Sequence, residues 1–444
     1  MVAPENNDPP AQDPAELLRA APDTLLGMIQ RGRGASRARA RSNRQAAATH
    51  VVDCIVHDPR WDHQVESRAW LYATLVTDLG IDLADLRPAY SSPHDPRGDS
   101  DAWIVTGVFE CLAQRGIPGA ITELRRYLAT GRDPHVAMGH LLPFVDHPEA
   151  EGLHDDLLAI VDDEELTYLL RSSWQFPDLS AHPWLTWRQS SPRTERAALA
   201  VEREQAESKR DRPGAAARNV RLRDRAVRFA VEAGYLTAAE ARSLGDERWT
   251  RFLLDIASVR LTDRELPREV RIWLRRQFRE LRSPDALTWA RTSLSPGGDQ
   301  HDDALSMLAR IGESTDAPML FDHMISAAAA GDEGIGDLCD IVPALGRLTY
   351  APARSPIEEI FVSTPYSYLR ERCAGALSTL AADFPVRYAI ECLDDCESGT
   401  REIGIAHADL SNPEVHERIK SIATDASEEL ETRRAAVTRI ERDV

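Results

Sequence analysis

An aromatic segment beside arginines is the feature of this 444-residue sequence that comes nearest to a binding site. The stretch WQFPDLSAHPWLTW contains Trp174, Trp184 and Trp187 and is bordered by Arg188 and Arg193. An aromatic ring next to a cation is what stacking on an unpaired base requires. The same residues also suit an irregular segment whose large rings anchor it between helices. We therefore predict a packing role, with base binding as the alternative.

A string of histidines and acids between residues 57 and 66 could supply nitrogen and oxygen ligands to a divalent cation. It contains His57, Asp58, Asp62, His63 and Glu66. Asp58 before a proline and Asp62 also make a good turn and N-cap for a helix that begins near His63. Capping is the prediction that we favour, and no metal site is expected.

The triplet His-Asp-Asp occurs twice, at residues 154–156 and 301–303. Its adjacent His and Asp resemble the metal-binding pair of the all-helical HD phosphohydrolases. Both triplets open apolar helices, where acids interact favourably with the helix dipole, so we predict dipole-stabilised acids. The sequence contains no glycine-rich phosphate loop, G-x-S-x-G elbow, H-E-x-x-H or Rossmann fingerprint. It therefore indicates no catalytic residue and no cofactor.

The six cysteines are too few and too scattered for a disulfide framework. Cys392 and Cys396 lie four residues apart, on one face of an expected helix, but no second Cys/His pair is near them to complete a zinc shell. We expect small core residues instead, in a cytoplasmic protein. No segment has the roughly 18 to 20 consecutive apolar residues that span a bilayer, and residues 1–14 lack the pattern of a signal peptide.

The elements that carry these residues are helices. Apolar residues recur with a period of 3.6, and β alternation is nearly absent. The stretches 63–79 and 102–112, for example, each end at a glycine or an aspartate-containing turn that suits a helix end. Short connectors such as GIPG at 116–119 favour antiparallel neighbours. The sequence thus predicts an all-α fold.

Helix-opening prolines recur towards the C-terminus, at Pro318, Pro356, Pro385 and Pro413. Proline suits a first helical turn because its missing N–H has no partner there. The helices that follow several of these prolines carry an arginine before small residues, at Arg372, Arg401 and Arg434. We expect the small residues to let paired helices pack closely and the arginine to hold an acid of the adjacent turn.

Residues 355–385, SPIEEIFVSTPYSYLRERCAGALSTLAADFP, resemble a HEAT repeat: a proline-led first helix, a polar turn, and a second helix of the form L-R-x-x-A-x-x-A-L. The resemblance extends over residues 300–440 and is fainter over 100–172. It implies an α–α superhelix, a HEAT-like solenoid built of stacked helix pairs, and it seldom implies a function.

A polar, highly charged stretch at 188–216 interrupts the repeats. We expect a linker or a solvated helix there. The predicted organisation is a tail with a first helix (1–34), an N-terminal HEAT-like domain (35–187), this stretch, and a C-terminal HEAT-like repeat domain (217–444).

Charge is uneven along the chain. The net charge is −19, and residues 301–444 contribute −14 of it, with 13 basic and 27 acidic side chains. Arginine supplies almost all the basic charge, which is typical of a high-GC bacterial genome. Six arginines between residues 31 and 44 form one basic island, and residues 191–230 form another with 11 basic and 6 acidic groups. Solvated faces paired with acids are the expected role, and contact with a polyanion is the alternative.

The function that fits these features best is a non-catalytic scaffold that binds another protein. An acidic C-terminal third favours a partner with a basic surface and disfavours nucleic acid and membranes. The alternative is a nucleic-acid-binding or base-repair protein. Alkylpurine DNA glycosylases built from HEAT-like repeats use tryptophans and an acid on a concave surface, and the segment 174–187 with the arginine islands is similar to that pattern.

Overall fold

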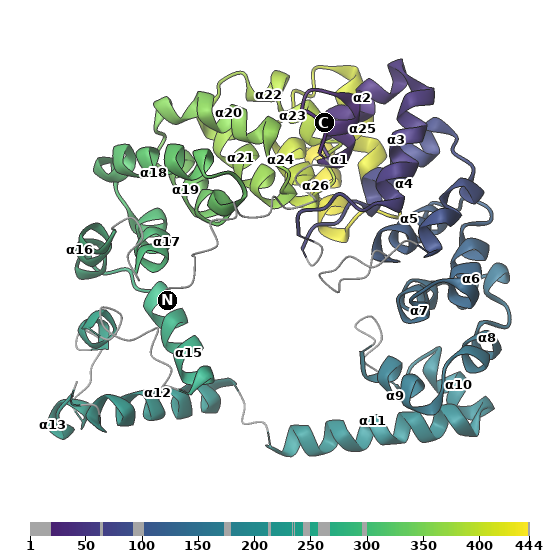
Figure 1. Cartoon of the computed structure of the whole chain (residues 1–444), viewed down its shortest axis with the longest axis horizontal. Coiled ribbons are helices and arrows are strands. Elements are labelled where there is room, and N and C mark those ends of the chain that lie inside the picture. The colour runs from purple at the N-terminus through teal and green to yellow at the C-terminus, as the bar shows by residue number, and fades with distance from the viewer. Residues whose placement is uncertain are drawn as a thin grey trace, which may run out of the picture. The chain divides into compact units, whose positions relative to one another are not determined.

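The computed structural model describes residues 19–62, 65–91, 102–172, 179–211, 215–232, 234, 236–242, 249–255, 267–294 and 300–442. Over these ranges the chain forms α-helices and short 3-10 helices and no strand, and the structure is 77% helical. The predicted all-α, helical-repeat fold is confirmed (Figure 1). No helix in the described ranges is long and apolar enough to cross a membrane.

Contacts between residues divide the chain into two compact units. One contains Met1–Val201 together with Glu358–Val444, and the other contains Glu202–Ile357. The sequence predicts an N-terminal domain at 35–187 and a separate C-terminal domain at 217–444. In the structure, residues 358–444 belong to the same unit as the N-terminal helices. Within the expected linker, residues 192–211 form one long helix, α11 (Pro192–Asp211).

The first unit begins with a run of consecutive helices. In order they are α1 (Leu25–Gln30), α2 (Ala35–Ser42), α3 (Arg44–Val56), α4 (Ala69–Leu79), the 3-10 helix η2 (Leu83–Ser91), α5 (Ala102–Gln114), α6 (Ala120–Thr130), α7 (Pro134–Leu141), α8 (Leu153–Ile160), α9 (Asp163–Ser172), α10 (Trp184–Ser190) and α11. Its C-terminal part contains α21 (Ser367–Leu380), α22 (Phe384–Arg387), α23 (Ala389–Cys392), α24 (Ser398–His407), α25 (Pro413–Thr424) and α26 (Leu430–Glu441).

The helices of the second unit are α12 (Ala215–Glu232), α13 (Ala238–Arg242), a helical segment at 249–255, α15 (Arg268–Arg279), α16 (Pro284–Ser293), α17 (His301–Ile311), α18 (Ala317–Ala329) and α19 (Ile335–Arg347). Among them, α16 packs against α17 and α18 packs against α19. Two helices cross the boundaries between the units: α11, which continues beyond Val201 into the second unit, and α20 (Arg354–Ser363).

The core of the first unit is one continuous apolar cluster from Ile29 to Val201, and Cys396 of the C-terminal part belongs to it. Helix α4 is apolar nearly all round, so residues 70–76 are all buried between its neighbours. In Figure 1, helices α1–α5 lie beside α21–α26. The two chain segments therefore share one core.

The recurring prolines stand where they were expected. Pro318, Pro385 and Pro413 lie in the first turns of α18, α22 and α25, and Pro356 is the third residue of α20. Because a first-turn N–H has no intrahelical partner, these prolines cost the helices no hydrogen bond.

Arginines of the second helices hold acids of the following turn, as predicted, but not always the arginines singled out. Arg401 pairs with Glu428 at 2.5 Å as expected, and Arg370 pairs with Asp395 at 2.7 Å. Arg291 repeats this pairing with Asp316 at 2.7 Å. By contrast, Arg372 lies over the ring of Tyr368, and Arg434 pairs with Glu431 on its own helix.

Close packing around Ala376 gives a stability prediction. Ala376 is 3% exposed on α21, which packs against α24. Ala376→Phe should overpack this contact and cost about 1–3 kcal/mol. Thermal unfolding measures the loss, with Ala406→Phe on the exposed side of α24 as a control that should change stability by less than about 0.5 kcal/mol. An Ala376→Phe variant that melts like the parent would show that this alanine is not at a helix contact.

Candidate binding pocket

The first basic island is used inside the first unit. The Nε of Arg31 donates to the carbonyl of Ser363 at 2.9 Å, and Arg33 pairs with Glu391 at 2.9 Å. Arg37 forms two ion pairs, one with Asp78 at 2.6 Å and one with Asp394 at 2.8 Å. The expected pairing with acids is thus confirmed for Arg33 and Arg37, and the acids lie mostly in the C-terminal repeats. Part of the acidic charge of the last third is thereby neutralised within the chain. The expected solvated face is wrong for these two arginines, because their side chains are 5% and 12% exposed.

Two glycines let these segments come close together. The carbonyl of Gly32, a residue with φ of +68°, accepts from the backbone N–H of Cys396 at 3.0 Å. A Cβ atom on Gly34 would lie 2.0 Å from the carbonyl oxygen of Glu391. Since real Cβ atoms are not found that close to backbone oxygen, only glycine fits between α1 and α23 at this point.

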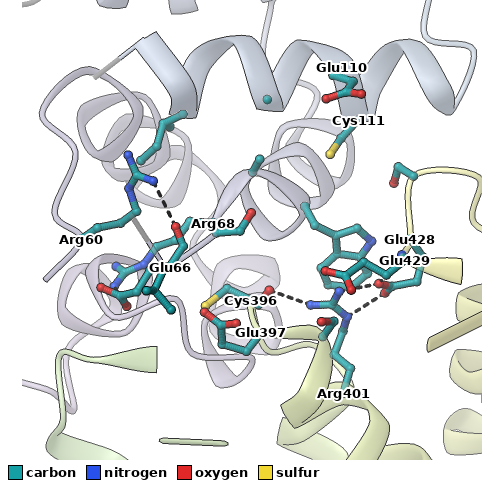
Figure 2. A pocket seen from close by; sticks show the side chains of 18 of the residues that line it. Arg60, Glu66, Arg68, Glu110, Cys111, Cys396, Glu397, Arg401, Glu428 and Glu429 are labelled. Carbon is teal, nitrogen blue, oxygen red and sulfur yellow. Dashed lines mark hydrogen bonds and ion pairs between the residues drawn. The ribbon is translucent and has the colours of Figure 1, made fainter. Parts of the chain in front are cut away.

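A pocket of about 590 Å³ opens in the first unit between the starts of three helices (Figure 2). Arg68, Glu397 and Glu429 are the N-cap residues of α4, α24 and α26. The lining residues are Arg60, Val65, Glu66, Ser67, Arg68, Ala69, Trp70, Ile104, Gly107, Glu110, Cys111, His140, Cys396, Glu397, Ser398, Arg401, Ser427, Glu428 and Glu429. N-terminal and C-terminal segments therefore both contribute walls.

All three arginines of the pocket are buried and paired. Arg60 pairs with Asp58, Arg68 with Glu66 at 2.9 Å, and Arg401 with Glu428 at 2.5 Å. The side chains of Arg68 and Glu66 are 0% exposed. Breaking such a pair would leave an unpaired buried charge, so these residues fix the walls.

Trp70 forms the floor of one side of the pocket. The guanidinium of Arg401 lies 4.0 Å from the centre of its ring, which is cation–π distance. The indole N–H of Trp70 donates to Asp425 at 3.2 Å, and Arg115 pairs with the same carboxylate at 2.9 Å. Because Asp425 and Arg401 come from the C-terminal repeats, Trp70 ties α4 to them.

Ser367 contacts two carboxyl groups, those of Glu66 and Glu397, whose pKa values are shifted in opposite directions. Its Oγ lies 2.7 Å from Glu66 and 2.5 Å from Glu397, and its backbone N–H donates to Glu66 at 2.8 Å. Glu66 is buried, but Arg68 and the donors around it outweigh burial and lower its pKa to about 2. For Glu397, burial dominates, and the nearby Asp395 and Glu66 add to it, so its pKa rises to about 7.

The proton count agrees with this assignment. One hydroxyl has one proton, so Ser367 can donate to only one of the two carboxylates. With Glu66 ionised and accepting that proton, the contact of Glu397 requires a proton on Glu397, which then donates to Ser367. The pocket wall therefore contains a carboxyl group that titrates near neutral pH.

The side chains that a ligand would meet are mainly acidic. Glu110, which pairs with His140, is 16% exposed, and Glu429 is exposed at the rim. Glu397 is half-buried between them and the buried ion pairs. Val65, with 53% of its surface exposed, adds an apolar edge. The pocket thus combines acids near solvent with apolar surface.

The predicted aromatic site lies elsewhere in the first unit and is packed. Trp184 is 0% exposed and Trp187 is 8% exposed, and the two rings meet edge to face. Arg188 pairs with Glu195 at 2.6 Å, and Arg193 pairs with Asp163 and the carbonyl of Leu158. Trp174 lies outside the described residues. Trp184 and Trp187 thus have the predicted packing role, and neither of these two described rings is exposed for the alternative, stacking on a base.

The expected helix start near His63 is wrong, because α4 begins at Ala69. The carboxylate of Glu66 instead holds the end of the preceding segment: its Oε1 accepts from the backbone N–H groups of Trp61 at 2.6 Å and Asp62 at 2.9 Å. His63 lies outside the described residues.

The acids of both His-Asp-Asp triplets lie in first turns, of α8 and α17, as predicted. Within the described ranges, no group of three or more His, Cys, Asp or Glu side chains could hold a metal ion.

The sequence indicates Glu66 only as a possible metal ligand, and it predicts no site role for Trp70, Arg370, Ser367 or Glu397. Compared with protein-family models, curated proteins and solved structures, the chain matches none of them.

Proposed function

We propose that the protein is a HEAT-type adaptor that binds another protein without catalysis, and that the pocket of the first unit receives a basic side chain of that partner. The observation that carries this proposal is the division of charge in the pocket. Its arginines are buried in ion pairs, whereas its solvent-reachable ionisable side chains are mainly carboxylates. Recurring arginine–acid pairs and helix-opening prolines support the HEAT-type assignment.

The pocket has the size and composition for one long cationic side chain. Its volume of about 590 Å³ lies within the usual range for binding sites. The stem of an arginine or lysine would lie along Val65, Ala69 and Ile104, with its charged end among Glu110, Glu397 and Glu429. Charge-assisted hydrogen bonds to carboxylates are among the stronger polar contacts that proteins form.

The acidic last third of the chain supports the same kind of partner. Although Arg33 and Arg37 neutralise Glu391 and Asp394, residues 301–444 retain an excess of acids over the arginines that reach them. Exposed carboxylates raise the local concentration of a basic partner. Added salt screens their charges and weakens this attraction. We also propose that this interaction takes place in the cytoplasm, because the cysteines are too scattered for a disulfide framework.

A labelled arginine-rich nonapeptide tests this proposal with the full chain. Replacing both Glu397 and Glu429 by glutamine keeps their shape. At pH 8, above the pKa of about 7 of Glu397, it removes two charges, so the affinity at that pH should fall at least tenfold. The control variant replaces Glu417 and Glu431 by glutamine, since these exposed acids pair with residues of their own helices. It should bind within about twofold of the parent. Equal loss in both variants, or no binding by the parent at low salt, would reject the pocket as the site.

A further inference from the structure

One face of α15 in the second unit is a stripe of arginines. Arg268, Arg271, Arg275 and Arg279 recur at intervals of three and four residues, and Arg282 follows the helix end. Residues at this spacing share one face of a helix, here over about 16 Å. The apolar face of α15, with Val270, Leu274 and Phe278, is buried.

The acids beside this stripe do not match its charge. A single carboxylate, that of Asp303 on α17, accepts from both Arg275 at 3.0 Å and Arg279 at 2.8 Å. Residues 215–232 and 267–282 together contain 11 arginines and only 4 acidic residues, although the net charge of the whole chain is −19. The local field of these helices is therefore positive within an acidic protein.

Arg310 of α17 adds unused donors beside the stripe. Its Nε and Nη2 atoms are buried and have no hydrogen-bond partner in the described part of the chain. Burial lowers the pKa of Arg310, and the positive charges of Arg282 and Arg279 lower it further. A phosphate oxygen would satisfy such donors and relieve the repulsion among the three guanidinium groups.

Aromatic rings lie on the same helix group. Trp249 and Trp273 are partly exposed, with ring centres 6.0 Å apart, and Phe252 packs against Trp249 at 5.1 Å. Arg223 of α12 lies 5.1 Å from the centre of the Trp249 ring. Unlike Trp184 and Trp187, these tryptophans retain exposed surface beside a cation, which is the arrangement that stacks on unpaired bases.

We propose that this surface of the second unit binds single-stranded nucleic acid, with phosphates on the α15 arginines and Arg310 and with bases on Trp249 and Trp273. A membrane is a poorer fit because the apolar face of α15 is buried, leaving Ile272 as its one exposed large apolar residue. A duplex would leave the tryptophans without unpaired bases. The surface is independent of the acidic pocket, so either proposal can fail alone.

Fluorescence anisotropy of the full chain with a labelled twelve-residue oligothymidylate tests this inference. The parent should bind at 50 mM salt, with log affinity falling linearly against log salt. Replacing Arg268 and Arg282 by glutamine should weaken binding and reduce the slope by about 1.4, since each lost phosphate contact contributes about 0.7 on a single strand. Arg434→Gln in the first unit is the matched control and should leave both values unchanged.

Replacing Trp249 and Trp273 by leucine should weaken binding at least tenfold with the salt slope unchanged, because stacking is not electrostatic. If that variant unfolds, Trp273→Phe serves instead: it keeps a stacking ring and should bind within about threefold. Absence of oligothymidylate binding at 50 mM salt would overturn the proposal. Equal affinities of the parent and the arginine variant, tighter binding to a duplex, or binding only to phosphatidylserine vesicles would do so as well.

Discussion

Asp395→Ala should destabilise the first unit by about 3–5 kcal/mol, the largest effect that we expect from a single substitution. Asp395 and Arg370 are each 0% exposed and joined at 2.7 Å. Removing the carboxylate leaves the guanidinium buried without its counter-ion, next to Arg68. Urea unfolding followed by circular dichroism measures the loss.

Two further variants identify its cause. Glu431→Ala removes an exposed acid whose partner Arg434 lies on the same helix, and it should cost less than about 0.5 kcal/mol. Replacing Arg370 by methionine together with Asp395 by leucine removes both charges, so it should recover much of the stability lost in Asp395→Ala. A loss below about 1 kcal/mol for Asp395→Ala would contradict the pairing.

The second large effect is a dependence on pH set by Glu397. Its pKa is about 7 in the folded chain and near 4.5 when unfolded, so the folded state binds the extra proton. The corresponding stability is fully present below pH 4.5 and is lost as the pH rises through 7, by about 3 kcal/mol. Glu66 acts in the opposite sense: with a pKa of about 2, its contribution is present above pH 4.5 and is lost as the pH falls towards 2.

Glu397→Gln isolates this effect. The amide N–H₂ of glutamine can donate to Ser367 at any pH, as the protonated carboxyl does at low pH. Near pH 5 the variant and the parent should be about equally stable, and at pH 8 the variant should be more stable by about 3 kcal/mol. A constant difference between the two proteins from pH 5 to pH 8 would show that Glu397 does not titrate in this range.

The local part of the fold was readable from the sequence. Helix periodicity, the first-turn prolines and the arginine–acid pairing of Arg401 depend on residues within one or two repeats. Arg370 follows the same rule and stands at the arginine of the L-R-x-x-A pattern, so the pairing of Arg370 with Asp395 could have been found from that signal.

The association of the chain ends was not predictable in this way. It depends on Gly32 and Gly34, on a backbone hydrogen bond to Cys396, and on ion pairs between residues over 300 positions apart. Nothing in the periodicity of either segment specifies such a distant partner. The only local sign was the arginine island, which has no acids of its own between residues 31 and 44.

The pocket was missed for the same reason. In the sequence, Trp70 looks like an ordinary core residue and Glu66 is one acid among several between residues 57 and 66. Their role is visible only when Arg401 and Ser367 lie next to them. Conversely, the tryptophans with the clearest sequence signal, Trp184 and Trp187, are core residues. An aromatic cluster in a sequence does not reveal which of its rings stay exposed.

Native-state hydrogen exchange tests most directly whether the two chain segments form one unit. Amides of α1–α4 and α21–α26 should open with a common free energy as urea approaches the unfolding midpoint, and Asp395→Ala should lower both sets equally. Protection of α21–α26 that persists after α1–α4 have exchanged, or an effect of Asp395→Ala confined to the C-terminal helices, would contradict a shared core and, with it, the pocket that the two segments enclose.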